Sequence, residues 1–165
     1  MPMPIHIRPM LSADLDAVLR VQAACYPPAM QEAAAVVKAR LDAAGATCLV
    51  ASDADGACGY LFAYPSRLGR VTDLGAPFAP APDADTLYLH DLAVDARALG
   101  RGLARALVER LLDLGRGLGL SHAALVSVQD STRFWSGLGF AARATADAGL
   151  LTYPADAVYM ARPLA

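Results

Sequence analysis

The segment from residue 97 to residue 104 carries residue types that suit an anion site at the start of a helix. It runs Arg-Ala-Leu-Gly-Arg-Gly-Leu-Ala, with glycines at positions 100 and 102. Glycine permits a tight bend and lets the backbone approach a ligand closely. Free main-chain N–H groups and the positive end of a helix dipole then point at one place. This spacing predicts a phosphate-binding turn.

Two common phosphate motifs do not fit this turn. A Walker A loop requires Gly-Lys-Ser/Thr, and Lys38 is the only lysine of the chain. A dinucleotide fingerprint GxGxxG would need a third glycine where Arg105 stands, and a βαβ unit at the start of the chain. Nucleotide hydrolysis and NAD-dependent oxidoreduction are therefore disfavoured.

A second set of polar residues lies directly upstream, in the strand-like run YLHDLAV at 88–94. His90 and Asp91 are the residues of this run that can take or hold a proton near neutral pH. Strict alternation predicts two faces, with Tyr88, His90 and Leu92 on one and Leu89, Asp91 and Ala93 on the other. His90 and Asp91 can share a face only if a bulge interrupts the strand.

The elements that must position these residues follow from periodicity. A helix follows the turn, because Leu103, Leu107, Leu111 and Leu114 form one apolar stripe. The predicted order is strand 5–10, helices 12–26 and 30–43, strands 47–52, 56–65 and 88–94, the helix from 103, strand 122–129, helix 130–139, and strands 140–145 and 157–164. Residues 66–85, rich in Pro, Gly and Ala, predict a long surface loop of the kind that often covers a binding site.

Length and composition set further bounds. The 165 residues suit one domain spanning 1–165, with net charge -2 and a pI near 5.8. This balance argues against nucleic-acid binding, and no apolar run is long enough to predict a membrane span. The first 15 residues lack a basic segment followed by an apolar one, so we expect a cytoplasmic protein without a secretory signal. The three cysteines lack metal-site spacing, so we expect no metal.

The turn resembles the Q/R-x-x-G-x-G/A motif of the GNAT superfamily of N-acetyltransferases, with Arg97, Gly100 and Gly102 at its defined positions. LHDLAVD before the turn, FWSGLGF at 134–140, VYMARPL near the end and the order of elements are also similar to this family. The resemblance implies an α/β (α+β) fold: a mixed, mostly antiparallel sheet of six to seven strands, splayed at its centre and flanked by about four helices.

The same resemblance implies acetyl-CoA as co-substrate. Its pantetheine arm would pair with the central strand by strand addition, and its pyrophosphate would bind the turn. A main-chain amide near Val94 would stabilise the oxyanion of a tetrahedral intermediate. The residues assigned to the cofactor on this basis are Leu92, Ala93, Val94, Arg97, Leu99, Gly100, Arg101, Gly102, Leu103, Ala104 and Trp135.

Catalysis is assigned less directly. His90 is the first candidate for the base, since the arylalkylamine branch of the family similarly places a histidine two positions before Leu-Ala-Val. Asp91 is the second candidate, as base or substrate contact. Trp135 stands where many relatives carry a tyrosine acid. The expected acceptor is a small-molecule amine with an apolar body, bound near Tyr26, Tyr64, the 66–85 loop and Tyr153. A homodimer remains open, as does an alternative function, a non-catalytic acyl-CoA-binding module.

Overall fold

The computed structural model describes residues 4–165 and contains the predicted elements in the predicted order. The strands are β1 (His6–Pro9), β2 (Leu49–Asp53), β3 (Gly56–Ser66), β4 (Thr86–Val94), β5 (His122–Ser127), β6 (Ala141–Ala142) and β7 (Val158–Pro163). The α-helices are α1 (Leu15–Cys25), α2 (Ala34–Ala44), α3 (Leu103–Gly117) and α4 (Thr132–Gly137). Short 3-10 turns include Pro28–Met30, Ala96–Ala98 and Ala148–Thr152. The predicted strand at 140–145 is reduced to the two residues of β6.

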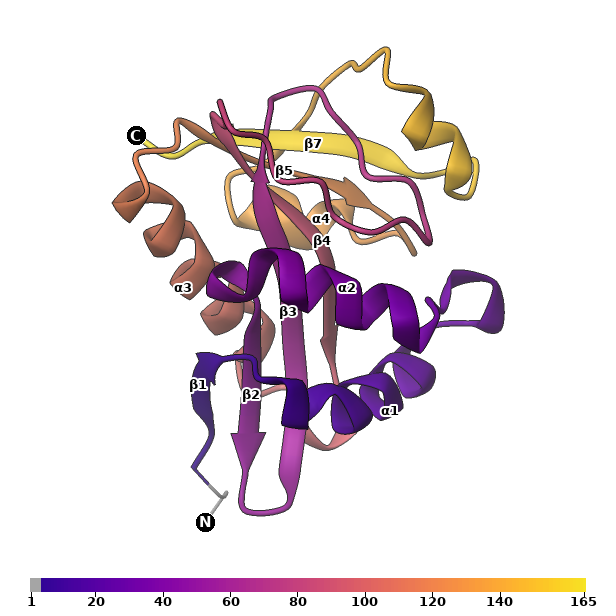
Figure 1. Ribbon diagram of the computed structural model, residues 1–165, viewed down its shortest axis with the longest axis vertical. Helices are drawn as coiled ribbons and strands as arrows, with labels where there is room; N and C mark the ends of the chain where they lie inside the picture. Colours follow the sequence, from indigo (N-terminus) through magenta and orange to yellow (C-terminus); the bar gives the residue numbers. More distant parts are fainter. Residues whose placement is uncertain (1–3) are drawn as a thin grey trace.

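The seven strands form one mixed sheet in the order β1-β2-β3-β4-β5-β7-β6. Every neighbouring pair is antiparallel except β4 and β5, which are parallel. In Figure 1, β5 and β7 run at a steep angle to β2 and β3, so the sheet opens where β4 meets β5. This is the mostly antiparallel, centrally splayed sheet that the resemblance to the GNAT superfamily implies.

Helices cover both faces of the sheet, and each face has its own hydrophobic core. On one face α1 and α2 pack on the sheet, with Val18, Val21, Val37 and Leu41 fully or nearly buried (Figure 1). On the other face the leucine stripe of α3 packs with Trp135 and Leu138 of α4. The predicted amphipathic character of α3 is confirmed, because its buried residues include Leu103, Leu107 and Leu111.

A bulge in β4 corrects the strict alternation expected for this strand. Phe62 of β3 pairs with Asp91, but the next residue, Ala63, pairs with Leu89. His90 is therefore an extra residue without a partner across the ladder. Leu89 and Leu92 consequently lie on the α3 side together, and His90 and Asp91 both lie on the α1 side.

The 66–85 segment is a loop, as predicted, and it is fastened to the connection between β6 and β7. The N–H of Val71 donates to Asp147 at 2.9 Å and the N–H of Leu74 donates to the Thr152 hydroxyl at 2.9 Å. Two segments far apart in sequence are therefore joined by hydrogen bonds.

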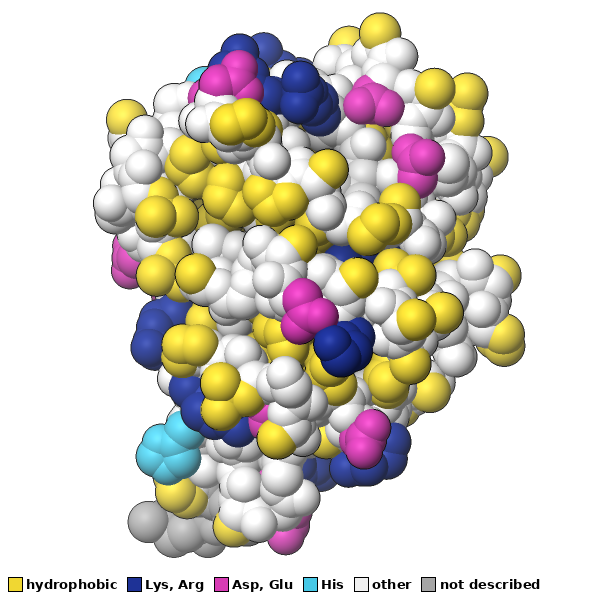
Figure 2. Space-filling model, in the orientation of Figure 1, with side chains coloured by type: hydrophobic (Ala, Val, Ile, Leu, Met, Phe, Trp, Pro, Cys, Tyr) yellow, Lys and Arg dark blue, Asp and Glu magenta, His cyan; other side chains and the backbone are white. Residues whose placement is uncertain are grey.

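Figure 2 shows positive and negative side chains interspersed over the face that carries α1 and α2. Within residues 4–165, no helix has the length and apolar character needed to span a membrane.

Candidate active site

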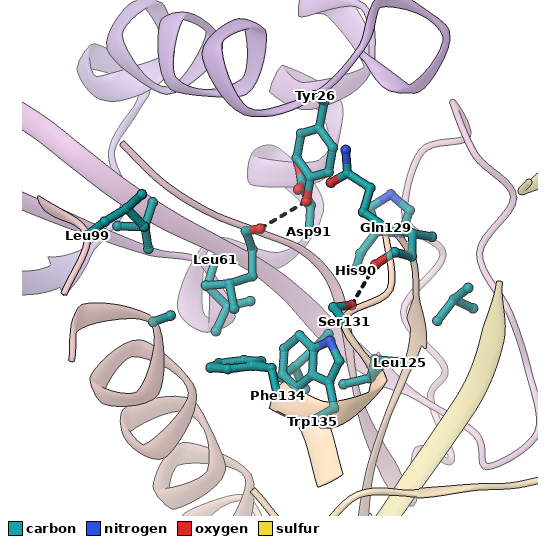
Figure 3. Close-up of a pocket in the computed structure, with 16 residues that line it drawn as sticks. Tyr26, Leu61, His90, Asp91, Leu99, Leu125, Gln129, Ser131, Phe134 and Trp135 are labelled. Carbon is teal, nitrogen blue, oxygen red and sulfur yellow. Dashed lines mark hydrogen bonds between the residues drawn. The ribbon is translucent and has the colours of Figure 1, made fainter. Parts of the chain in front are cut away.

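The central feature of the site is a slot between β4 and β5. These strands pair only from Thr86–His122 to Leu89–Leu125 and then separate. The space between them is a cavity of about 270 Å³. We call it the β4–β5 slot; its lining residues are Tyr26, Leu61, Leu89, His90, Asp91, Leu92, Val94, Leu99, Ala104, Leu125, Val126, Val128, Gln129, Ser131, Phe134 and Trp135. Figure 3 shows Tyr26, Asp91 and Gln129 on one side of it and Phe134 and Trp135 on the other.

The aromatic wall of the slot comes from α4. Trp135 is 8% exposed and packs edge-to-face on Phe140, with ring centroids 5.5 Å apart. Phe134 packs against Trp135 and remains 37% exposed toward solvent. Trp135, predicted as a cofactor contact, thus lies in the wall of the slot, while most of its ring belongs to the core.

The edge of β4 that faces the slot offers main-chain groups. The Tyr26 hydroxyl donates to the carbonyl of Leu92 at 2.9 Å, and the Cys25 thiol donates to the carbonyl of Val94 at 3.3 Å. Because the N–H and C=O of a strand residue point to the same side, the N–H groups of Leu92 and Val94 also face this edge. Ala93 alternates with them and places its side chain in the core under α1. The slot therefore has a strand edge that a polar, extended ligand could pair with.

The predicted anion turn lies at the outer end of the slot. Gly100 and Gly102 have φ values of +78° and +70°, the left-handed region that favours glycine. Gly102 precedes the first residue of α3 and provides no side-chain cap, so the first N–H groups of the helix point outward. They open into a hollow of about 320 Å³, here called the α3 hollow.

The α3 hollow and the β4–β5 slot form one continuous channel. Val94, Leu99, Ala104 and Phe134 line both. Leu103, also assigned to the cofactor, lines the hollow, although its side chain is 5% exposed and belongs to the core. An anion held at the helix terminus could therefore continue as an extended chain along β4.

The side chain of Arg97 has a different partner from the one expected. Its guanidinium donates to Asp53 at 2.5 Å and to the carbonyl of Gly56 at 3.0 Å, both in the β2–β3 hairpin. This ion pair holds the pKa of Asp53 below its ordinary value. Arg97 thus braces the turn against the hairpin, whereas Arg101, at the tip of the turn, is exposed.

His90 and Asp91 lie together at the inner end of the slot, as a result of the bulge. Asp91 accepts a hydrogen bond from the Tyr60 hydroxyl at 2.8 Å. Burial raises the pKa of Asp91, although the neighbouring His90 and the Tyr60 hydroxyl act in the opposite direction. The side chain of His90 is only 2% exposed. Two groups able to exchange protons therefore share one buried surface.

A smaller cavity of about 30 Å³ continues from this point, and we call it the inner chamber. Its lining residues are Tyr26, Met30, Glu32, Leu74, His90, Asp91, Val126, Val128 and Tyr153. Tyr26, Tyr153 and Leu74 of the 66–85 loop, which the sequence analysis grouped around an acceptor, thus line the same chamber. Tyr64 does not fit that expectation, because it is 5% exposed, stacks on Phe78 and hydrogen-bonds to Thr72.

Sequence reasoning missed a buried ion pair beside His90. Glu32 and Arg40 have side chains only 3% and 1% exposed. The two terminal nitrogens of the Arg40 guanidinium, Nη1 and Nη2, each donate to one carboxylate oxygen of Glu32 at 2.5 Å. Glu32 also accepts from the N–H of Gly75 at 2.7 Å and lies 3.1 Å from Nε2 of His90. In the sequence both residues look like surface charges of an alanine-rich helix, and no local signal marks their burial.

The turn after β5 carries backbone strain beside the slot. Gln129 and Asp130 have φ values of +53° and +57°, which residues with a side chain rarely adopt. Such conformations cost about 1–3 kcal/mol each and cluster at functional sites. Gln129 lines the slot and, in Figure 3, its side chain lies beside Tyr26 and Asp91 on the same side of it. Over the described part of the chain, no cluster of three or more His, Cys, Asp or Glu residues could hold a metal ion.

Comparison with known proteins supports a relationship along most of the chain. The model of the Acetyltransferase (GNAT) family matches residues 15–140. A search of curated proteins gives no significant match.

Solved structures resemble the chain over nearly its whole length. The loading GNATL domain of CurA from Lyngbya majuscula has a TM-score of 0.80 at 12% identity, covering 98% of both chains. The ribosomal-protein-S18-alanine N-acetyltransferase from Escherichia coli has a TM-score of 0.71 at 17% identity, covering 98% of this chain and 95% of the other. A GNAT family N-acetyltransferase (YhbS) from Escherichia coli, crystallised with CoA, has a TM-score of 0.68 at 23% identity, covering 100% and 84%.

At these identities the structural likeness shows the fold. The family match adds the sequence evidence, because it spans well over half of the residues and includes β4, the anion turn, α3 and α4. With a splayed sheet of the same kind and a matching sequence profile, this protein belongs to the acetyltransferase (GNAT) family.

Proposed function

We propose that this protein is an acetyl-CoA-dependent N-acetyltransferase that acts on a small amine with an apolar body. The observation that carries the proposal is the continuous channel from the α3 hollow through the β4–β5 slot to His90 and Asp91. It joins an anion site, a strand edge and proton-exchanging side chains in the order in which coenzyme A presents its pyrophosphate, its pantetheine amides and its thioester.

The residues of the channel fit this co-substrate. The N–H groups at the start of α3 suit the pyrophosphate, since a helix terminus attracts negative charge. The C=O of Leu92 and the N–H and C=O of Val94 suit the pantetheine amides by strand addition. Leu99 and Phe134, exposed by 65% and 37%, would be covered by the bound arm. Acetyl-CoA supplies the thioester carbonyl that the amine attacks.

The chemistry requires an unprotonated amine. A primary ammonium of pKa about 10 carries a proton at neutral pH and cannot attack. In the proposed mechanism Asp91 holds the ammonium and His90 takes its proton. The N–H of Leu92, two residues before Val94 and nearer to His90, stabilises the oxyanion of the tetrahedral intermediate. When the C–S bond breaks, the second proton of the nitrogen passes to the departing thiolate, so no separate acid is needed.

The hydroxyl groups of Ser127 and Tyr153 are poorly suited to act as a general acid. Ser127 is 2% exposed and hydrogen-bonds to Ser131, away from the slot surface. The Tyr153 hydroxyl donates to the carbonyl of Thr72 at 2.7 Å, and burial raises its pKa. A thiol of pKa about 8.5 is already a tolerable leaving group, which agrees with Trp135 at the position of the usual tyrosine.

The lining of the inner chamber supports a small acceptor. Met30, Leu74, Val126 and Val128 are apolar. Among the residues that the structure describes, the Asp91 carboxylate forms no ion pair, whereas Glu32 is paired with Arg40. One uncompensated negative charge suits one ammonium group. A polyamine would bring further charges that this surface does not neutralise.

The proposal is tested by calorimetry with coenzyme A and by a thiol-release assay with acetyl-CoA and an amine panel. We expect CoA binding, turnover of apolar monoamines, and a loss of about 10²- to 10⁴-fold in rate for His90→Ala with CoA affinity retained. His122→Ala is the matched control, since His122 is at the far start of β5. Turnover restricted to polycationic acceptors would refute the acceptor class, and an absence of CoA binding would refute the whole proposal.

A further inference from the structure

The imidazole of His90 is enclosed by side chains from several elements. Phe78 packs edge-on against it, with ring centroids 5.6 Å apart, and Tyr88 stacks on it at 6.2 Å. The titratable and charged groups around the ring are Glu32, Arg40, Tyr88, Asp91 and Tyr153. Its two nitrogens face different partners, so the tautomer of the ring follows from what each partner can donate or accept.

Nε2 faces a group that can only accept. The two oxygens of Glu32 lie 3.1 and 3.2 Å from it. Burial alone would raise the pKa of Glu32, but hydrogen bonds and charge from His90 and Arg40 outweigh burial and hold that pKa well below its ordinary value. Glu32 is therefore ionised and has no proton to give. Nε2 must carry the hydrogen, and Nδ1 of the neutral ring has a free lone pair.

Nδ1 faces a hydroxyl oxygen whose hydrogen is already used in a hydrogen bond to another group. The Tyr153 hydroxyl lies 3.4 Å from Nδ1 and donates to the carbonyl of Thr72 at 2.7 Å. Tyr153 therefore cannot donate a hydrogen bond to Nδ1 without breaking its shorter hydrogen bond to the carbonyl of Thr72. Its lone pairs can, however, accept a hydrogen bond from Nδ1 once that nitrogen has gained a proton.

Resting on the proposed function, we propose that Glu32 is a positioning residue that fixes the tautomer of His90 and so makes Nδ1 the atom that deprotonates the acceptor amine. In this step the N–H bond of the acceptor ammonium breaks, and its proton forms the new Nδ1–H bond. The electron pair stays on the amine nitrogen. The imidazolium then donates from Nε2 to Glu32 and from Nδ1 to Tyr153, and it returns the proton to solvent after the reaction.

Glu32 is itself held rigidly, as a positioning residue must be. Its main chain forms two hydrogen bonds with the side chain of Gln22 of α1, at 3.1 and 3.0 Å. Its carboxylate is held by Arg40 of α2 and by the N–H of Gly75. Arg40 in turn donates to the carbonyl of Ala76 at 2.8 Å. Helices α1 and α2 and the 66–85 loop therefore all fix the position of the carboxylate.

The tautomer can be measured directly in the wild-type protein. Nitrogen-15 NMR of the imidazole rings at alkaline pH should show a protonated Nε2 and an unprotonated Nδ1 for His90. His122, whose Nδ1 lies 2.9 Å from the Ser121 hydroxyl, is an internal reference away from the site. This measurement needs no turnover, so its outcome is independent of the proposed function. A His90 ring protonated at Nδ1 and bare at Nε2 would overturn the inference.

Glu32→Gln supplies the kinetic test. Loss of the carboxylate should give a mixed His90 tautomer while the His122 signals stay unchanged. It should lower kcat by at least about tenfold with CoA affinity retained, because part of the His90 population then has its lone pair on the wrong nitrogen. An unchanged tautomer or an unchanged kcat in a folded variant would contradict the proposal. If this variant fails to fold, the wild-type spectrum still decides.

Discussion

Gly102→Ala separates the strain of the anion turn from its role in binding. The residue has φ +70°, and no atom lies within 4 Å of the position that a Cβ would take. Alanine therefore fits sterically in the protein, and its penalty comes from the left-handed backbone, about 1–2 kcal/mol. For a chain of this length, that loss lowers Tm by roughly 2–8 °C.

The same chain offers a matched control at the opposite end of the same helix. Gly119 follows α3, has φ +76° and also has no atom within 4 Å of a Cβ. Gly119→Ala should lower the stability by a similar amount. Only Gly102→Ala should weaken CoA binding, because a turn that relaxes to relieve strain moves the N–H groups of Leu103 and Ala104.

The expected loss of affinity follows from those N–H groups. A hydrogen bond to a charged group contributes about 1.5–3 kcal/mol, so the loss of one raises Kd about tenfold to over a hundredfold. Titration calorimetry with CoA measures Kd, and thermal unfolding measures stability. If both variants lose stability equally and both bind CoA as the wild type does, the helix terminus is not the pyrophosphate site.

Two further predictions concern buried polar groups. Tyr88 is 1% exposed and its hydroxyl has no hydrogen-bond partner among the described residues, so Tyr88→Phe should leave the free energy of unfolding unchanged or raise it by about 1 kcal/mol; a clear loss in urea denaturation would reveal a partner. Glu32 has a folded pKa below its ordinary 4.5, so its stabilisation is present above that pH and is lost as pH falls below it. The stability gap between wild type and Glu32→Gln, about 3 kcal/mol or more at neutral pH, should therefore narrow in acid, while the exposed control Glu109→Gln should show no such gap; a gap that persists at low pH would contradict this assignment.

The fold could be predicted because its signals are local. The leucine stripe of α3, the alternating strands and the glycines of the anion turn each involve residues a few positions apart, and they predicted the order of elements. The pairing and splaying of the strands were expected from the resemblance to the GNAT superfamily. Boundaries were less accurate where a neighbouring strand decides them, as in β6, which ends at Ala142 and not at residue 145 as predicted.

The site could be predicted only in part, for a corresponding reason. His90, Asp91 and the turn were found because their types are distinctive in a short segment. The bulge depends on the register between β3 and β4, which no single strand encodes. The Glu32–Arg40 pair depends on how α2 and the 66–85 loop enclose it. The guanidinium of Arg97 meets the β2–β3 hairpin, more than 40 positions away in the chain.

His90 is the one residue between Leu89 and Leu92 that has no partner on β3, and it makes this part of β4 one residue longer than a regular strand. Without His90, the residues Leu89, Asp91 and Leu92 would keep their partners Ala63, Phe62 and Leu61 in a regular ladder, so the later side chains of the strand would stay on their present faces. Deleting this one residue would therefore remove one of the two proton-exchanging side chains and leave the strand edge at Leu92 and Val94 in place.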